Sequence, residues 1–162
     1  MRGDYLNSSS GASNWDAKIE HLDPAGDGDV STYSKELSAD DSGKIYVCNI
    51  ATYDCTVKLP AVASAPGMNF KFILSYASNN EASKNLVVTA NAAGEDIVGN
   101  VMVAGAVLEI AGNSSIEIDS SAGAATYGDW LSFVSDGSYW YIDGSVVTAS
   151  AVVQAAGLAM TS

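Results

Sequence analysis

The stretch that decides the fold is DWLSFVSDGSYWYID, residues 129–143. Two alternating segments, 129–135 and 138–143, flank Asp136-Gly137, a dipeptide that readily takes the positive φ angles of a two-residue hairpin turn. The alternation predicts two antiparallel strands joined by a tight turn. In the register that we expect, Ser135 pairs with Ser138, Phe133 with Trp140, and Leu131 with Ile142.

This hairpin has two faces of different character. One face, which we assign to the core, carries Leu131, Phe133, Trp140 and Ile142. The opposite face carries Trp130, Val134, Tyr139 and Tyr141. Because so large an aromatic area is rarely left in water, we expect another sheet, the N-terminal segment or a second subunit to cover it.

A related pattern continues through the rest of the chain. From about residue 31, short apolar runs alternate with Gly, Asn, Asp and Ser, a spacing typical of a sandwich or barrel. We expect strands at 31–37, 44–50, 54–59, 68–76, 84–90, 97–103, 106–111, 115–119, 129–135 and 138–143, with a last strand at 145–153 left open. The predicted fold class is all-β: an antiparallel β-sandwich or barrel, jelly-roll-like, with a polar N-terminal arm.

Two further hairpins are expected. One joins Ala106–Ala111 to Ser114–Asp119 across Gly112-Asn113, with these residues inward: Leu108, Ile110, Ile116 and Ile118. The other joins Lys44–Ile50 to Cys55–Leu59, and either a two-residue or a four-residue loop preserves its side-chain parity. Its core face would carry Tyr46, Cys48, Ile50, Cys55, Val57 and Leu59.

The chain divides into three parts. Residues 1–30 form a polar arm, 31–145 the β-sandwich domain, and 146–162 a C-terminal strand or an exchanged arm. The large apolar residues of the arm after Leu6 are Trp15, Ile19 and Leu22. Since so polar a segment buries too little to order itself, we expect it to be disordered or laid against a partner surface, with Trp15 and Ile19 as anchors.

Composition restricts the partners. The 162 residues suit one domain, and 7 basic against 19 acidic residues give a net charge of −12. Such a field disfavours nucleic acid and anionic membranes and favours basic partners. No apolar run is long enough to span a bilayer, and the first residues lack the apolar stretch of a signal peptide. We therefore expect the protein to stay where it is made or to leave inside a larger particle.

The residues that could carry chemistry are few. Cys48 and Cys55 would face each other in the two-residue register, so a strained cross-strand disulfide competes with the interpretation that we favour, two buried reduced thiols. His21 is the one histidine and lies in the polar arm. A zinc site or a histidine-dependent triad is therefore not expected, and neither is a cofactor.

Two groups of acidic residues could form a site. Asp23, Asp27 and Asp29 lack the spacing of a calcium loop, so we interpret them as a turn-rich linker, with a calcium site completed by another chain as the alternative. Glu117 and Asp119 point to one side of a strand and could form the carboxylate pair of a polysaccharide hydrolase. Alternating acids on an exposed strand are ordinary solvation, and we expect no enzyme.

Three motifs in order carry a resemblance. The first is L-x-x-x-D-S-G-K, here Leu37, Asp41, Ser42, Gly43 and Lys44, followed by strands that end in Leu59-Pro60. MNFKFILSY follows, and GDWLSFVSDGSYWYIDG closes the series with G-D-x-x-x-x-x-x-D-G-x-x-W-Y. Over roughly residues 32–144 the chain resembles phage capsid decoration (cement) and head-fibre proteins, whose β-module also occurs in tail-fibre domains.

The resemblance implies a function. It implies a non-enzymatic structural protein, made in the host cytoplasm and commonly trimeric, that binds the major capsid protein on the outside of the assembled virion and stabilises it. The expected capsid or subunit contacts are Trp15, Ile19, Leu22, Trp130, Tyr139 and Tyr141. The alternative is a receptor-binding fibre knob whose aromatic residues stack on host surface glycans.

Overall fold

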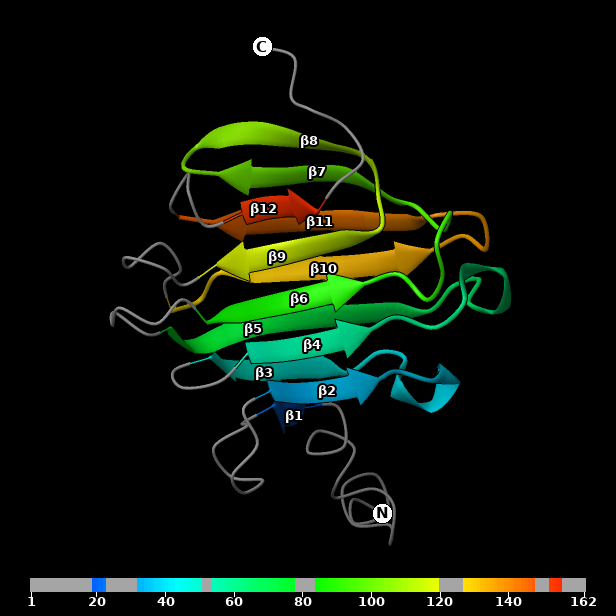
Figure 1. Cartoon of the computed structure of the whole chain (residues 1–162), viewed down its shortest axis with the longest axis horizontal. Helices are drawn as coiled ribbons and strands as arrows, with labels where there is room; N and C mark the ends of the chain where they lie inside the picture. Colours follow the sequence, from blue (N-terminus) through cyan, green and yellow to red (C-terminus); the bar gives the residue numbers. More distant parts are fainter. Residues whose placement is uncertain are drawn as a thin grey trace, which may run out of the picture.

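The computed structural model describes residues 19–22, 32–50, 54–77, 84–119, 127–147 and 152–155. Within them the chain forms two β-sheets that pack face to face (Figure 1), so the predicted all-β sandwich is confirmed. Neither sheet closes on itself, which rules out the barrel alternative for these residues.

Sheet A has seven strands and sheet B has five. The order in sheet A is β1 (Ile19–Leu22), β3 (Ile45–Ile50), β5 (Asn69–Ala77), β10 (Trp130–Ser135), β11 (Trp140–Val146), β7 (Ile97–Val103) and β8 (Ala106–Asn113). The order in sheet B is β12 (Val152–Ala155), β9 (Ser115–Asp119), β6 (Asn85–Thr89), β4 (Asp54–Lys58) and β2 (Thr32–Glu36). Sheet B is the nearer layer in Figure 1.

The first half of the chain winds between the two sheets. β1, β3 and β5 lie side by side and parallel in sheet A, while β2, β4 and β6 do the same in sheet B. The chain therefore runs out along one sheet and back along the other (Figure 1). The purely antiparallel sheet expected from the sequence is wrong, because strands that alternate between layers pair with the strand two places away.

The second half is more antiparallel. β10 pairs with β5 and β11, β7 pairs with β8, and β9 pairs with β6 and β12, all antiparallel. The parallel contact between β11 and β7 attaches the β7–β8 pair to the other five strands of sheet A. β10 and β11 therefore occupy the middle of sheet A.

Inward side chains of both sheets form one core. Tyr46 stacks on Phe72 with ring centroids 5.3 Å apart, and Phe72 meets Phe133 edge-on at 5.8 Å. Trp140 lies 5.7 Å from Phe70 and donates its indole N–H to the carbonyl of Pro60 at 3.3 Å. Burying side chains of this size stabilises the fold by about 1.5–3 kcal/mol each.

The hairpin of residues 129–143 is confirmed, with a shifted register. Ser135 pairs with Trp140 and Phe133 with Ile142, so the loop has four residues, 136–139, instead of two. A shift of two positions keeps every side chain on its predicted face. Leu131, Phe133, Trp140 and Ile142 are all buried, as predicted.

The other two predicted hairpins are wrong. β8 belongs to sheet A and β9 to sheet B, so Gly112-Asn113 lies where the chain crosses between layers instead of turning within one. β3 and β4 are separated in the same way. The core faces were nevertheless predicted correctly: Tyr46, Cys48, Ile50, Cys55, Val57, Leu59, Ile110, Ile116 and Ile118 are buried, and Leu108 packs against them.

Part of the expected polar arm belongs to the sandwich. Residues 19–22 form β1, which pairs with β3 at the edge of sheet A, and Leu22 is fully buried. The rest of the expected arm lies outside the described residues. The open interval 145–153 contains the end of β11 and the start of β12.

Candidate contact surface

The two outer faces of the sandwich differ in chemistry. Strand side chains alternate between the core and the outside, so each sheet presents one outer face. Among polar residues such as Lys71, Asn100 and Asp143, the outer face of sheet A carries ten large apolar residues: Ile19, Ile45, Val47, Ile73, Val98, Met102, Val107, Trp130, Val134 and Tyr141. We call this set the apolar face.

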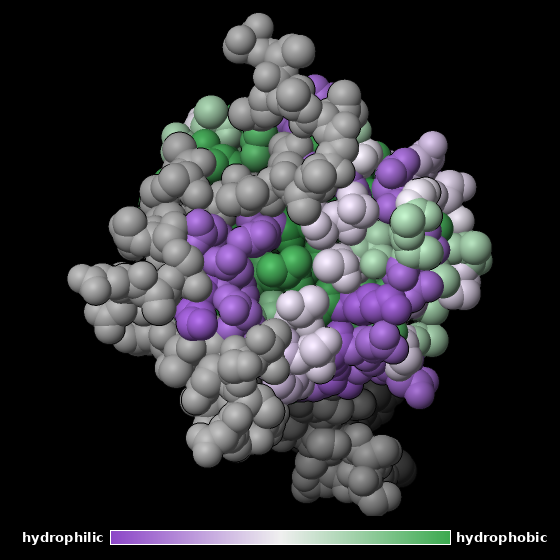
Figure 2. All heavy atoms as spheres, in the orientation of Figure 1, coloured by the Kyte–Doolittle hydropathy of each residue, from purple (hydrophilic) through white to green (hydrophobic). Residues whose placement is uncertain are grey.

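The outer face of sheet B is polar. Its described outward side chains on β2, β4, β6 and β9 are Ser34, Glu36, Asp54, Thr56, Lys58, Asn85, Thr89, Glu117 and Asp119, with Val87 as the apolar exception. Figure 2 shows this side of the molecule, where purple and pale residues surround a small green area. A face of this kind is well solvated and needs no partner.

The registers bring apolar residues from distant parts of the chain together. Trp130 lies opposite Ile73, which lies opposite Val47. On the other side of β10, Val134 pairs with Tyr141, which lies beside Val98. With seven strands about 4.8 Å apart and segments about 20 Å long, the whole outer face of sheet A, polar positions included, covers roughly 600 Å², and each partner contributes ~800 Å² to a standard interface.

Several residues of this face are exposed. Met102 is 42% exposed, Val134 47% and Val107 67%. The exposure of Val107 is high for a valine inside a strand, since β-branched side chains are usually packed there. The apolar face is therefore a candidate contact surface.

Trp130 lies near the centre of this surface and is partly buried. The ammonium group of Lys71, on the adjacent β5, lies 4.2 Å from the centroid of its ring. This is a cation–π contact, which is favourable where the cation is partly desolvated.

The end of the β10–β11 hairpin, which we call the hairpin tip (residues 136–141), adds two more aromatic rings. Tyr139 and Tyr141 are each 44% exposed, and their ring centroids are 6.3 Å apart in an edge-on arrangement. The carboxylate of Asp136 accepts hydrogen bonds from the backbone N–H groups of Ser138 (2.7 Å) and Tyr139 (2.9 Å) and from the hydroxyl of Tyr141 (3.0 Å). These donors, the backbone groups foremost, lower the pKa of Asp136.

The six predicted contact residues have different positions. Ile19, Trp130 and Tyr141 lie on the apolar face and Tyr139 lies at its hairpin tip, so the fold brings these four to one side. Leu22 is fully buried and offers no surface to another chain. Trp15 lies outside the described residues.

Most of the apolar face was not predicted from the sequence. Ile45, Val47, Ile73 and Val98 were not identified, because each strand was interpreted as half-buried with one apolar parity. The signal was present, since runs such as Ile45-Tyr46-Val47 are apolar at consecutive positions. Runs of that kind indicate strands that are covered on both faces.

The two cysteines are free and buried. Cys48 belongs to β3 in sheet A and Cys55 to β4 in sheet B, so the cross-strand disulfide geometry considered from the sequence does not occur. Burial raises the pKa of Cys55 to about 12 and that of Cys48 well above its ordinary value. Both therefore act as small apolar core residues, the interpretation favoured from the sequence.

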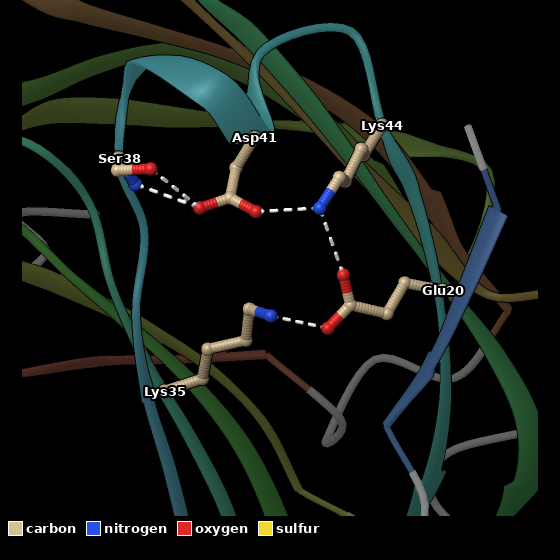
Figure 3. A network of polar contacts seen from close by, with 5 residues as sticks. All are labelled: Glu20, Lys35, Ser38, Asp41 and Lys44. Atoms are coloured by element: carbon tan, nitrogen blue, oxygen red, sulfur yellow. Dashed lines mark hydrogen bonds and ion pairs between the residues drawn. The ribbon is translucent and has the colours of Figure 1, made fainter. Parts of the chain in front are cut away.

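A network of charged residues joins the two sheets at the β1/β2 end (Figure 3). Glu20 of β1 accepts hydrogen bonds from Lys35 of β2 and from Lys44, the latter at 3.1 Å. Lys44 also bonds Asp41 at 2.7 Å, and Asp41 accepts two further bonds from Ser38. Inward-facing charges on edge strands hinder pairing with other strands, so this network has a structural explanation.

The residues of the three motifs also have structural roles. Gly43 N–H donates to the carbonyl of Asn69 at 2.8 Å, which attaches the D-S-G-K turn to β5. Asp129 is buried and accepts the N–H of Val147 at 3.0 Å. Trp140 bonds Pro60, so the closing motif contacts the Leu59-Pro60 motif directly. These residues therefore build the sandwich.

The acidic candidates lie away from the apolar face. Glu117, on the outer face of sheet B, accepts a hydrogen bond from Asn85, and burial followed by the charges of Asp119 and Asp54 raises its pKa. No outward aromatic ring on the described strands of that sheet accompanies it to hold a sugar. His21 is exposed on β1, and residues 23–31 with their three aspartates lie outside the described residues.

No family model matches the chain, and no curated protein matches it. Among the described residues, no group of three or more His, Cys, Asp or Glu side chains is arranged to hold a metal ion. The same residues contain no helix long and apolar enough to cross a membrane.

Proposed function

We propose that this chain is a virion structural protein that binds the outer surface of an assembled phage capsid and stabilises it, and that it does so as a trimer. The observation that carries the proposal is the contrast between the polar outer face of sheet B and the apolar face of sheet A. A domain with one apolar and one polar outer face is suited to lie between a partner and water. The resemblance of the three motifs to capsid decoration proteins suggests the major capsid protein as that partner.

The apolar face meets the shell protein or a neighbouring subunit. Its aromatic residues, Trp130 and Tyr141, and Tyr139 at the hairpin tip are of the types that dominate binding energy at protein interfaces. The net charge of −12 favours basic partner surfaces and speeds association with them.

Stabilisation follows from mass action. A protein that binds only the assembled shell favours assembly by RT ln(1 + [L]/Kd), about 4 kcal/mol at a thousand-fold excess over Kd. Several contacts within one trimer raise the overall affinity because each later contact is intramolecular. No catalytic residue enters this mechanism.

The test is co-sedimentation of the purified protein with capsids that lack it, together with the mass of the free protein by light scattering. We expect saturable binding and a free mass of three chains. A protein that does not sediment with the capsids at any concentration contradicts the proposal.

A second candidate is a fibre knob that binds host glycans. The exposed Tyr139–Tyr141 pair favours it, because aromatic rings beside a carboxylate can stack on a sugar and accept its hydroxyl groups. This function predicts binding to host cells or purified surface glycans, with no binding to capsids.

A further inference from the structure

The hairpin tip combines two exposed aromatic rings with a fixed carboxylate. Two backbone N–H groups and the Tyr141 hydroxyl hold Asp136, so the carboxylate keeps its orientation in the absence of any partner. Oδ1 already accepts two of these hydrogen bonds, whereas Oδ2 accepts one. A carboxylate oxygen has two lone pairs, so Oδ2 retains acceptor capacity for a donor from solvent or from another molecule.

Two other aromatic residues of this chain bind a cation within the chain. Lys71 lies over Trp130 at 4.2 Å, and Lys35 lies over Tyr46 at 5.5 Å from the ring centroid. Within the described residues, no such contact is found over Tyr139 or Tyr141, although a negative charge lies directly beside them. The tip therefore offers the ring faces and the anion that a cation needs.

The described residues of a second copy offer no free lysine for this site. Lys35, Lys44, Lys58 and Lys84 are in ion pairs, and Lys71 is held over Trp130. These are all the lysines of the described residues, which contain no arginine. The net charge of −12 also favours a basic partner at this exposed tip.

We propose that the hairpin tip binds an arginine or lysine side chain of a different, basic protein, with the cationic group over Tyr139 or Tyr141 and one N–H donated to Asp136 Oδ2. This inference rests on the proposed function in identifying that protein as the capsid protein. A guanidinium group suits the site best, because it is planar and stacks on an aromatic ring while donating in its own plane.

The first test needs no capsid. Backbone amide NMR of the full chain is recorded during titration with N-acetyl-arginine amide, and again with N-acetyl-citrulline amide, its neutral isostere. We expect shifts confined to residues 136–141, with binding of the arginine probe at least about tenfold stronger than that of citrulline and weakened by salt. Equal binding of the two probes, or shifts spread over the whole acidic surface, overturns the inference.

Asp136→Asn is the matched variant, because asparagine keeps the acceptor for Ser138 and Tyr139 but removes the charge. Asp143→Asn is its control, because Asp143 is exposed on β11 outside residues 136–141 and its replacement removes the same charge. We expect Asp136→Asn to lower arginine binding about tenfold and Asp143→Asn to leave it unchanged. Equal effects of the two variants, or tip binding by a neutral oligosaccharide that survives Asp136→Asn, contradict the inference.

Capsid binding separates this inference from the proposed function. If wild-type protein co-sediments with capsids and Asp136→Asn binds at least about tenfold more weakly, the inference holds. If Asp136→Asn binds capsids as wild type does, the cation site is wrong and the decoration function stands. If wild-type protein ignores capsids, the decoration function fails, and the arginine titration alone decides whether the tip binds cations.

Discussion

Asp41 shows at the residue scale how a motif position stabilises the fold. Burial by itself raises the pKa of its carboxyl, but the hydrogen bonds from Lys44 and Ser38 outweigh burial and lower the pKa to about 2 from an ordinary value of 3.8. A carboxyl whose pKa is depressed on folding stabilises the folded state above its unfolded pKa. The stabilisation, about 2 kcal/mol, is lost as the pH falls from about 4 to about 2.

Asp41→Asn is therefore expected to lower the free energy of unfolding by about 1–2 kcal/mol at pH 7, with the difference from wild type shrinking toward pH 2. Urea unfolding at several pH values measures it. Asp40→Asn, at the exposed neighbouring position, is the control and should change stability by less than about 0.5 kcal/mol. A difference between Asp41→Asn and wild type that stays constant with pH would contradict this account.

The hairpin tip is the proposed binding site that depends on individual residues, and only part of it was predictable from the sequence. Sequence alternation was enough to place Trp130, Val134, Tyr139 and Tyr141 on one face, and the structure confirms it. It could not indicate that Asp136 bonds the Tyr141 hydroxyl, because that contact depends on the four-residue loop that replaced the expected two-residue turn.

At the scale of elements, Gly99 marks the closest approach of two parallel strands. It lies in β7 opposite Ile142 of β11 with φ +139°, and a Cβ at this position would lie 2.2 Å from the backbone oxygen of Ile142. Backbone cannot yield as a flexible side chain can. The contact of β7 with β11 therefore requires glycine here.

Gly99→Ala is expected to destabilise the protein by about 2–4 kcal/mol, through both the unfavourable φ and the clash. Gly105→Ala is the matched control, because Gly105 also has a positive φ of +81° but nothing lies within 4 Å of its Cβ position. That variant should cost about 1 kcal/mol. Equal losses of stability in urea unfolding would show that the clash with Ile142 does not govern the strand contact.

The strands were predictable and their partners were not. Period-two alternation in segments such as Phe70, Phe72 and Leu74 identifies a strand and its core face, because burial requires that parity. Pairing depends on where the chain goes after each strand, and no local signal distinguishes a hairpin from a crossing to the other layer. β1 was missed because only four residues of a polar segment form it.

At the scale of the whole molecule, the two outer faces define the orientation of the domain. The all-β sandwich followed from composition and turn spacing, whereas the apolar face is assembled from strands as distant in sequence as β1 and β11, which only the folded topology brings into one sheet. The outer face of sheet A carries few charges, among them Lys71, Glu109 and Asp143, although the whole chain has a net charge of −12. A basic partner surface with exposed apolar residues would complement it.

If the chain acts through its apolar face, paired lysine substitutions on the two outer faces should have different effects. Met102→Lys with Val134→Lys alters exposed positions of that face, while Thr56→Lys with Val87→Lys makes the same change of charge on the outer face of sheet B. In co-sedimentation with capsids that lack the protein, accompanied by the mass of each free variant, the account predicts at least a tenfold loss of capsid binding or loss of the trimer for the first pair only. Wild-type binding and mass in the Met102/Val134 variant would contradict it.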